Sequence, residues 1–197
     1  MQEYRPYLML DNSDKNGHAE TMIDYVVSWC LRCSCHLYTK ECQPILYHYC
    51  KYMLCKLLGK VHEMDNLTID DVHVWKQEQY IDLWVEVVLL VDKKKEKHAI
   101  LIENKYFTGV HDDQLKRYKS TFIDYYGNRS DEFPKDNLHY VLITCIYDVD
   151  SHYEALATAA KAADFGIYHL YELLDDSLCN KASESDIFNE LFIREWL

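Results

Sequence analysis

The hydrophobic positions along the chain change their period near residue 60. In residues 20–36 and 43–58, apolar side chains recur every three or four positions, which predicts two amphipathic helices. Gly59 follows the second of them as a natural helix terminator. Beyond it, residues 67–75 are rich in β-formers, and residues 80–91 alternate apolar and polar side chains. The pattern therefore predicts a helical pair at about 17–58 followed by a change to strands.

The second half of the chain mixes the two periods. A lysine-rich turn at 93–97 separates the strand at 80–91 from an apolar strand that ends in polar residues. The predicted elements after this turn are a strand at 98–105, a helix from 111 with an apolar stripe of Leu115, Tyr118, Phe122 and Tyr125, a buried strand at 138–147, a helix at 153–163, a short strand at 166–170 and a C-terminal helix at about 185–197. A hairpin followed by a crossover indicates an α/β domain with a central mixed β-sheet flanked by helices. We expect one domain over residues 1–197, with its sheet core at about 67–171.

Composition narrows the class of protein. The 197 residues include 33 Asp and Glu against 21 Lys and Arg, for a formal charge of −12. A hydrophobic content of 49% excludes a disordered chain, and the acidity argues against a protein that coats nucleic acid by bulk electrostatics. The first residues lack a signal-peptide pattern, and no apolar run approaches the ~20 residues of a membrane helix. We therefore expect a cytoplasmic protein without a membrane partner.

The chain has 8 cysteines, and most of them lie close together, between Cys30 and Cys55. The spacing Cys30-x-x-Cys33 is compatible with a zinc or iron–sulfur site, but no second Cys or His pair completes a set of four ligands. Cys30 and Cys50 also fall on apolar helical stripes, where a free cysteine acts as a small hydrophobe. Structural packing is the favoured interpretation, and a metal or redox role is the alternative.

Candidate chemistry is concentrated in Asp82 and the Glu103-Asn104-Lys105 segment. Period-2 geometry puts Glu103 and Lys105 on one face of their strand. If the two strands form a hairpin centred near Lys94, Asp82 and Glu103 lie side by side, with a bulge or longer turn absorbing the unequal arms. Paired carboxylates suit magnesium or manganese, and a nearby lysine can hold an attacking water.

A simpler interpretation assigns no catalysis to these residues. Asp82 and Glu103 would be edge-strand charges that discourage aggregation, with Lys105 as their ion-pair partner. Glu86 shares the face of Asp82 and is expected to be solvated. The helix that follows decides against this interpretation, because Gln114 and Tyr118 lie one turn apart and can face the same site.

Asp82, Glu103-x-Lys105 and Gln114-x-x-x-Tyr118 together resemble the PD-(D/E)XK nuclease superfamily, and the trailing Gln and Tyr are similar to those of its RecB-like bacterial members. The likeness covers residues 18–147, although Ile81 stands where the family often has proline. It implies a restriction-endonuclease-like fold. It also implies the following roles: Asp82, Glu103 and the backbone carbonyl of Asn104 as ligands of Mg or Mn, Lys105 as the residue that positions water, Gln114 and Tyr118 as site residues, and Glu20 as a further ligand from the first helix.

The distribution of charge agrees with this resemblance. Residues 93–119 hold eight basic against four acidic side chains, a local charge of +4 within the acidic chain. The expected function is a metal-dependent nuclease acting on nucleic acid, with DNA as the favoured substrate. A homodimer or a protein partner is compatible with the sequence. The alternative is a catalytically inactive interaction module of the same fold, in a defence or DNA-processing system, which the acidity outside this strip would suit.

Overall fold

The computed structural model describes residues 18–105, 109–110, 113–146 and 150–194, with side chains from residue 21 onward. Its helices are α1 (His18–Cys33), α2 (Leu37–Cys42), α3 (Pro44–Leu57), α4 (Gln114–Gly127), α5 (Ser151–Ala163) and α6 (Asp186–Phe188). Its strands are β1 (Leu67–Glu78), β2 (Ile81–Val91), β3 (Lys94–Lys105), β4 (Leu138–Thr144) and β5 (Gly166–His169). None of the helices within the described residues has the length and apolar character needed to cross a membrane.

The five strands form one mixed sheet in the order β1-β2-β3-β4-β5. β1, β2 and β3 pair antiparallel through short turns, whereas β3, β4 and β5 pair parallel. The parallel pairs need crossover connections, which α4 and α5 supply. The predicted α/β fold with a mixed sheet flanked by helices is confirmed.

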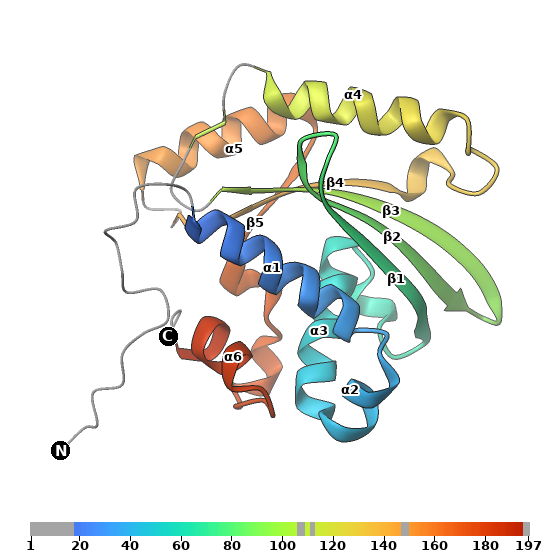
Figure 1. The fold of residues 1–197 in the computed structure, drawn as a ribbon, viewed down its shortest axis with the longest axis vertical. Coiled ribbons are helices and arrows are strands. Elements are labelled where there is room, and N and C mark those ends of the chain that lie inside the picture. The colour runs from blue at the N-terminus through green and yellow to red at the C-terminus, as the bar shows by residue number, and fades with distance from the viewer. Residues whose placement is uncertain (1–17, 106–108, 111–112, 147–149, 195–197) are drawn as a thin grey trace.

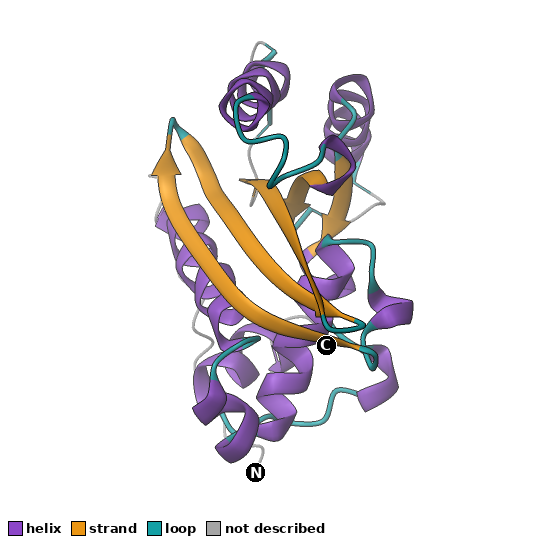
Figure 2. Cartoon of the chain, turned by 90° about the vertical axis from the view of Figure 1, so that its right-hand side faces the viewer, coloured by secondary structure: helices purple, strands orange, loops and turns teal. Residues whose placement is uncertain are grey.

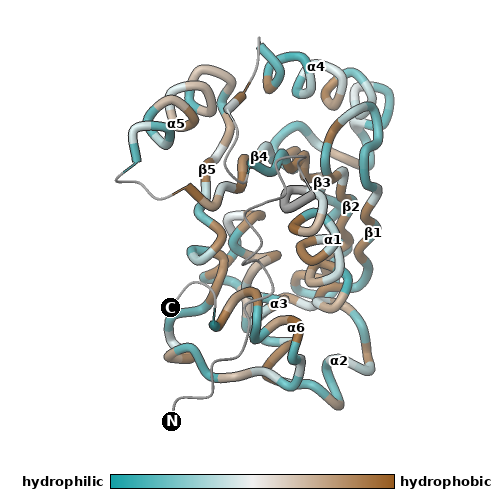
Figure 3. The backbone as a smooth tube through the Cα atoms, turned by 60° about the vertical axis from the view of Figure 1, so that its left-hand side comes forward, coloured by the Kyte–Doolittle hydropathy of each residue, from teal (hydrophilic) through white to brown (hydrophobic). Residues whose placement is uncertain are grey.

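The sheet lies between two layers of helices (Figures 1 and 2). One face packs on α1, α3 and the C-terminal segment, and the other packs on α4 and α5, so each face has its own hydrophobic cluster. The last eight residues of β3, residues 98–105, are all buried, because β3 is the central strand of the sheet and helices cover both of its faces. Figure 3 shows the hydrophobic stretches gathered along the strands between the helices.

The β2–β3 hairpin is tighter than the lysine run suggests. Val91 pairs with Lys94, so the turn consists of Asp92 and Lys93, which have φ values of 49° and 66°. Two left-handed residues are the geometry of a two-residue hairpin turn, and most of the lysine run joins β3. The prediction of a turn centred near Lys94 with a compensating bulge is therefore wrong.

Three further details differ from the pattern-based prediction. The short helix α2 was not predicted, and the C-terminal helix is a short α6 continued by a π-helical segment at Asn189–Arg194. On α4 the buried position is Tyr126, while Tyr125 is 51% exposed. The apolar stripe turns by one residue along α4 because Tyr126 packs against Trp84 and Phe133 on the sheet side.

Candidate active site

Asp82 and Glu103 lie on neighbouring interior strands. The β2–β3 ladder ends at the pair of Leu83 and Ile102, which directly adjoin Asp82 and Glu103 in sequence, and the charge of Asp82 acts on Glu103. Beyond this pair the backbone N–H of Asn104 donates to the Asp82 carboxylate, so both acidic residues lie where the ladder ends. Because β2 and β3 are the second and third of five strands, the interpretation of these carboxylates as edge-strand charges is wrong.

Glu103 gathers contacts from its own strand and from α4. Its Oε1 lies 2.8 Å from the Nζ of Lys105 and accepts a hydrogen bond of 2.7 Å from the Nε2 of Gln114. The same Nε2 lies 3.1 Å from the hydroxyl oxygen of Tyr118. The alternation of β3 and the four-residue spacing on α4 thus bring four predicted residues into one connected group. Their catalytic roles stay predictions.

Asp82 is held by two donors from outside its own strand. The Nε2 of Gln77 donates to Oδ1 at 3.0 Å, and the backbone N–H of Asn104 donates to Oδ2 at 2.9 Å. Gln77 stands across from Asp82 in the β1–β2 hairpin and has a φ of 57°. On the other face of the sheet, the Nδ2 of Asn104 donates to Oδ1 of Asp24, 2.6 Å away. Hydrogen bonds to Asn104 therefore connect Asp24 on α1 with Asp82 on β2.

The environment of Glu103 disfavours its charged form. The side chain is 1% exposed, and burial followed by the nearby charge of Asp82 raises its pKa from 4.5 to about 8. The ion pair with Lys105 acts in the opposite direction but does not offset burial. Two close carboxylates with little water around them are a costly arrangement that an added cation would relieve.

Among the described residues, the side chains that could bind a metal ion here are the two carboxylates of Asp82 and Glu103. Within the described ranges there is no group of three or more His, Cys, Asp or Glu side chains placed to hold a metal ion. Glu20 lies in the first turn of α1, and its side chain falls outside the described residues. The roles of Glu20 and of the Asn104 carbonyl as ligands stay predictions.

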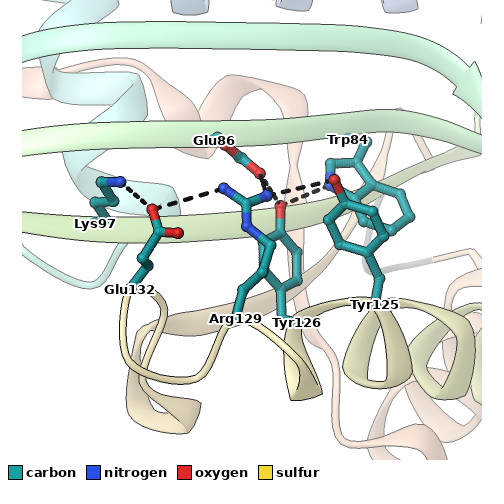
Figure 4. Close-up of polar contacts among 7 residues, drawn as sticks. All are labelled: Trp84, Glu86, Lys97, Tyr125, Tyr126, Arg129 and Glu132. Carbon is teal, nitrogen blue, oxygen red and sulfur yellow. Dashed lines mark hydrogen bonds and ion pairs between the residues drawn. The ribbon is translucent and has the colours of Figure 1, made fainter.

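Glu86, expected to be solvated, is part of a structural network (Figure 4). Its side chain is 17% exposed and lies 2.6 Å from Nη1 of Arg129. The hydroxyl of Tyr126 donates to the same Glu86 oxygen at 2.9 Å, and Nε1 of Trp84 donates to that hydroxyl at 2.8 Å. Arg129 comes from beyond the end of α4, so the network ties that helix to β2.

The cysteine segment supports packing rather than ligation. Cys30, Cys33, Cys50 and Cys55 are buried among the side chains of α1 and α3, and all 8 cysteines are free. A side-chain hydrogen bond with Cys50, followed by burial, raises the pKa of Cys33, and burial raises that of Cys55 to about 11. Thiols with raised pKa values stay protonated and pack as small hydrophobic side chains.

Asp24 and Gln77 were missed from the sequence for different reasons. Asp24 interrupts the apolar stripe of α1 beside Ile23 and one turn before Val27, and it is 5% exposed. A carboxylate on a buried helix face is a detectable signal. Gln77 carries no such signal, because its contact depends on a left-handed backbone conformation in a hairpin.

Comparison with known proteins agrees with this geometry. A family model described as the PD-(D/E)XK nuclease superfamily matches residues 9–197, nearly the whole chain. Comparisons with curated proteins and with solved structures returned no significant match. The family assignment agrees with the mixed sheet between helices and with the clustering of Asp82, Glu103 and Lys105. The chain belongs to the PD-(D/E)XK nuclease superfamily.

Proposed function

We propose that this protein is a metal-dependent nuclease that hydrolyses phosphodiester bonds of DNA. The observation that carries the proposal is the convergence on Glu103 of Asp82, Lys105 and Gln114 from β2, β3 and α4. Superfamily membership supports the class of reaction.

The residues fit a hard divalent cation. Oε2 of Glu103 is buried and has no hydrogen-bond partner, so this carboxylate oxygen would be stabilised by a cation bound next to it. Asp82 adds a second carboxylate at the neighbouring strand position. Magnesium takes oxygen ligands and is commonly held by one or two carboxylates together with waters and substrate phosphate. A set of two carboxylates therefore suffices for this cation.

Bound magnesium would supply Lewis acidity, polarising the phosphate and lowering the pKa of the attacking water. The chain supplies the positioning. Lys105, held by Glu103 at 2.8 Å, presents an ammonium beside the carboxylates, where it can hold the water and stabilise charge that develops on the phosphate. Gln114 fixes the Glu103 carboxylate from α4, and the N–H of Asn104 fixes Asp82.

Cleavage of DNA by purified protein tests the proposal. We expect cleavage in magnesium or manganese, no cleavage in chelator, and loss of activity in Asp82→Ala and Lys105→Ala. Lys95→Ala is the matched control, because Lys95 belongs to the same strand but pairs with Asp70 at 2.8 Å, near the other end of β3. Full activity in the Asp82 and Lys105 variants would overturn the assignment.

The alternative is an inactive module that retains the fold. Its support is the acidity of the chain outside residues 93–119, which suits a basic protein partner better than a nucleic acid. Calorimetric titration with manganese separates the two functions. Binding that Asp82→Asn abolishes supports the nuclease, whereas no binding to the wild-type protein supports the module.

A further inference from the structure

A groove lined by aromatic rings opens beside the candidate active site. It has a volume of about 270 Å³ and lies between the β1–β2 hairpin and α4. We call it the aromatic groove, and its lining residues are Trp75, Glu78, Gln79, Trp84, Glu86 and Tyr125. No part of the proposed hydrolysis uses these side chains.

The groove has a rigid floor and two open walls. Trp84, the floor, is 3% exposed, and its Nε1 is fixed by the hydrogen bond to Tyr126. Tyr125 stands edge-on to it, with ring centroids 5.0 Å apart, as the close-up shows (Figure 4). Trp75 is the cross-strand partner of Trp84 on β1. Trp75 and Tyr125 are 42% and 51% exposed, so both have ring surface available to a ligand.

The groove continues directly from the candidate active site. Trp84 follows Asp82 by two residues on the same face of β2, a distance of about 7 Å. On α4, Tyr125 follows Tyr118 by seven residues, which places both on the same side of the helix about 10 Å apart. A nucleic-acid strand bound across Asp82 and Tyr118 would therefore place its next nucleotide at the aromatic groove.

The lining combines exposed ring surface with two carboxylates, of which Glu86 is paired within the protein. Glu86 forms an ion pair with Arg129 at 2.6 Å and accepts a hydrogen bond from the hydroxyl of Tyr126, so its charge is already compensated within the protein. The rest of the lining is ring surface on Trp75 and Tyr125, with the Glu78 carboxylate and the Gln79 amide at the margin, where a carboxylate can accept from the amino group of a base. Aromatic walls with a few hydrogen-bonding groups suit a nucleobase, which stacks through its faces and bonds through its edge.

We propose that the aromatic groove stacks an unpaired nucleobase next to the phosphate to be cleaved, so that the substrate is single-stranded at the site. This inference rests on the proposed nuclease function and names its substrate class. It also explains how a protein with a net charge of −12 could bind nucleic acid, since base stacking depends little on charge and adds to a weak electrostatic attraction. A base paired within a duplex would have its faces covered by its neighbours and could not enter.

Binding of a fluorescently labelled single-stranded oligonucleotide tests the proposal. Anisotropy is measured in chelator, where no cleavage occurs, so the result does not depend on whether the protein is a nuclease. We expect Trp75→Ala and Tyr125→Ala each to weaken binding about tenfold or more. Trp75→Phe, which keeps a ring, should restore much of the loss. Wild-type protein should prefer the single strand to the same sequence in a duplex.

Tyr38→Ala is the matched control, because Tyr38 is 59% exposed on α2, away from the groove. It should bind as the wild type does. Unchanged circular dichroism of the Trp75 and Tyr125 variants excludes misfolding, and either variant alone suffices if the other is unstable. Equal affinity of both variants and wild type would overturn the proposal. So would binding of an arginine-rich peptide, instead of the oligonucleotide, that Trp75→Ala abolishes.

Discussion

Replacing Glu103 by glutamine should make the folded protein more stable while removing its activity. Glu103 is 1% exposed and lies beside Asp82, so its charged form is disfavoured in the folded state. Glutamine has nearly the same shape, can still accept from Lys105 through its carbonyl oxygen, and carries no charge to bury. The variant thus removes the unfavourable electrostatics and leaves the packing.

The magnitude follows from the raised pKa of Glu103. The folded pKa is about 8 against 4.5 for the ordinary side chain, so the folded state binds a proton that the unfolded state releases between these values. The free energy of unfolding therefore falls as pH rises from 4.5 to 8, by up to about 1.4 kcal/mol per pH unit. At pH 7 the accumulated cost is about 3 kcal/mol, which glutamine should recover.

Urea unfolding of wild type and Glu103→Gln in chelator, at pH values from 5 to 8, measures this effect. The two proteins should differ little at pH 5 and diverge steadily towards pH 8. Glu132→Gln is the control, since Glu132 is exposed, pairs with Lys97 and has a lowered pKa, so its loss should be neutral or slightly destabilising. A Glu103→Gln variant no more stable than wild type at pH 7, or one with the same pH dependence, would refute the reasoning.

The remaining predictions concern the metal and two structural networks. Millimolar magnesium or manganese should raise the melting temperature of the wild type by mass action but not that of Asp82→Asn, and equal shifts in both proteins would contradict the proposed ligand. Tyr126→Phe should lower the free energy of unfolding by about 1–3 kcal/mol in urea, because Trp84 loses its acceptor and Glu86 a donor. His139 has a pKa lowered to about 4 by burial and by the charge of a neighbouring histidine, so the folded state excludes a proton that the unfolded state binds below about 6.5. Stability should therefore fall as pH drops from 6.5 to 4, by about 3 kcal/mol, and His139→Gln should flatten this loss in acid unfolding curves; an unchanged slope would contradict it.

The amino-acid sequence determined the elements and the central residues of the candidate site. Strand alternation put Glu103 and Lys105 on one face, and helical spacing put Gln114 and Tyr118 on one side of α4; in the structure these side chains lie in contact. Such predictions succeed because they depend on local periodicity, which the backbone geometry of a strand or a helix imposes directly. The order of helices and strands then limits the possible topologies to a few.

The tertiary structure decided what surrounds those residues. Asp24 meets Asn104 across 80 positions of sequence, and the pKa of Glu103 rises because helices cover both faces of the sheet. Glu86, expected to be solvated, is instead a half-buried partner of Arg129 for the same reason. Burial, pairing and the groove beside Asp82 are properties of surfaces brought together by packing, and no local pattern encodes which surfaces meet.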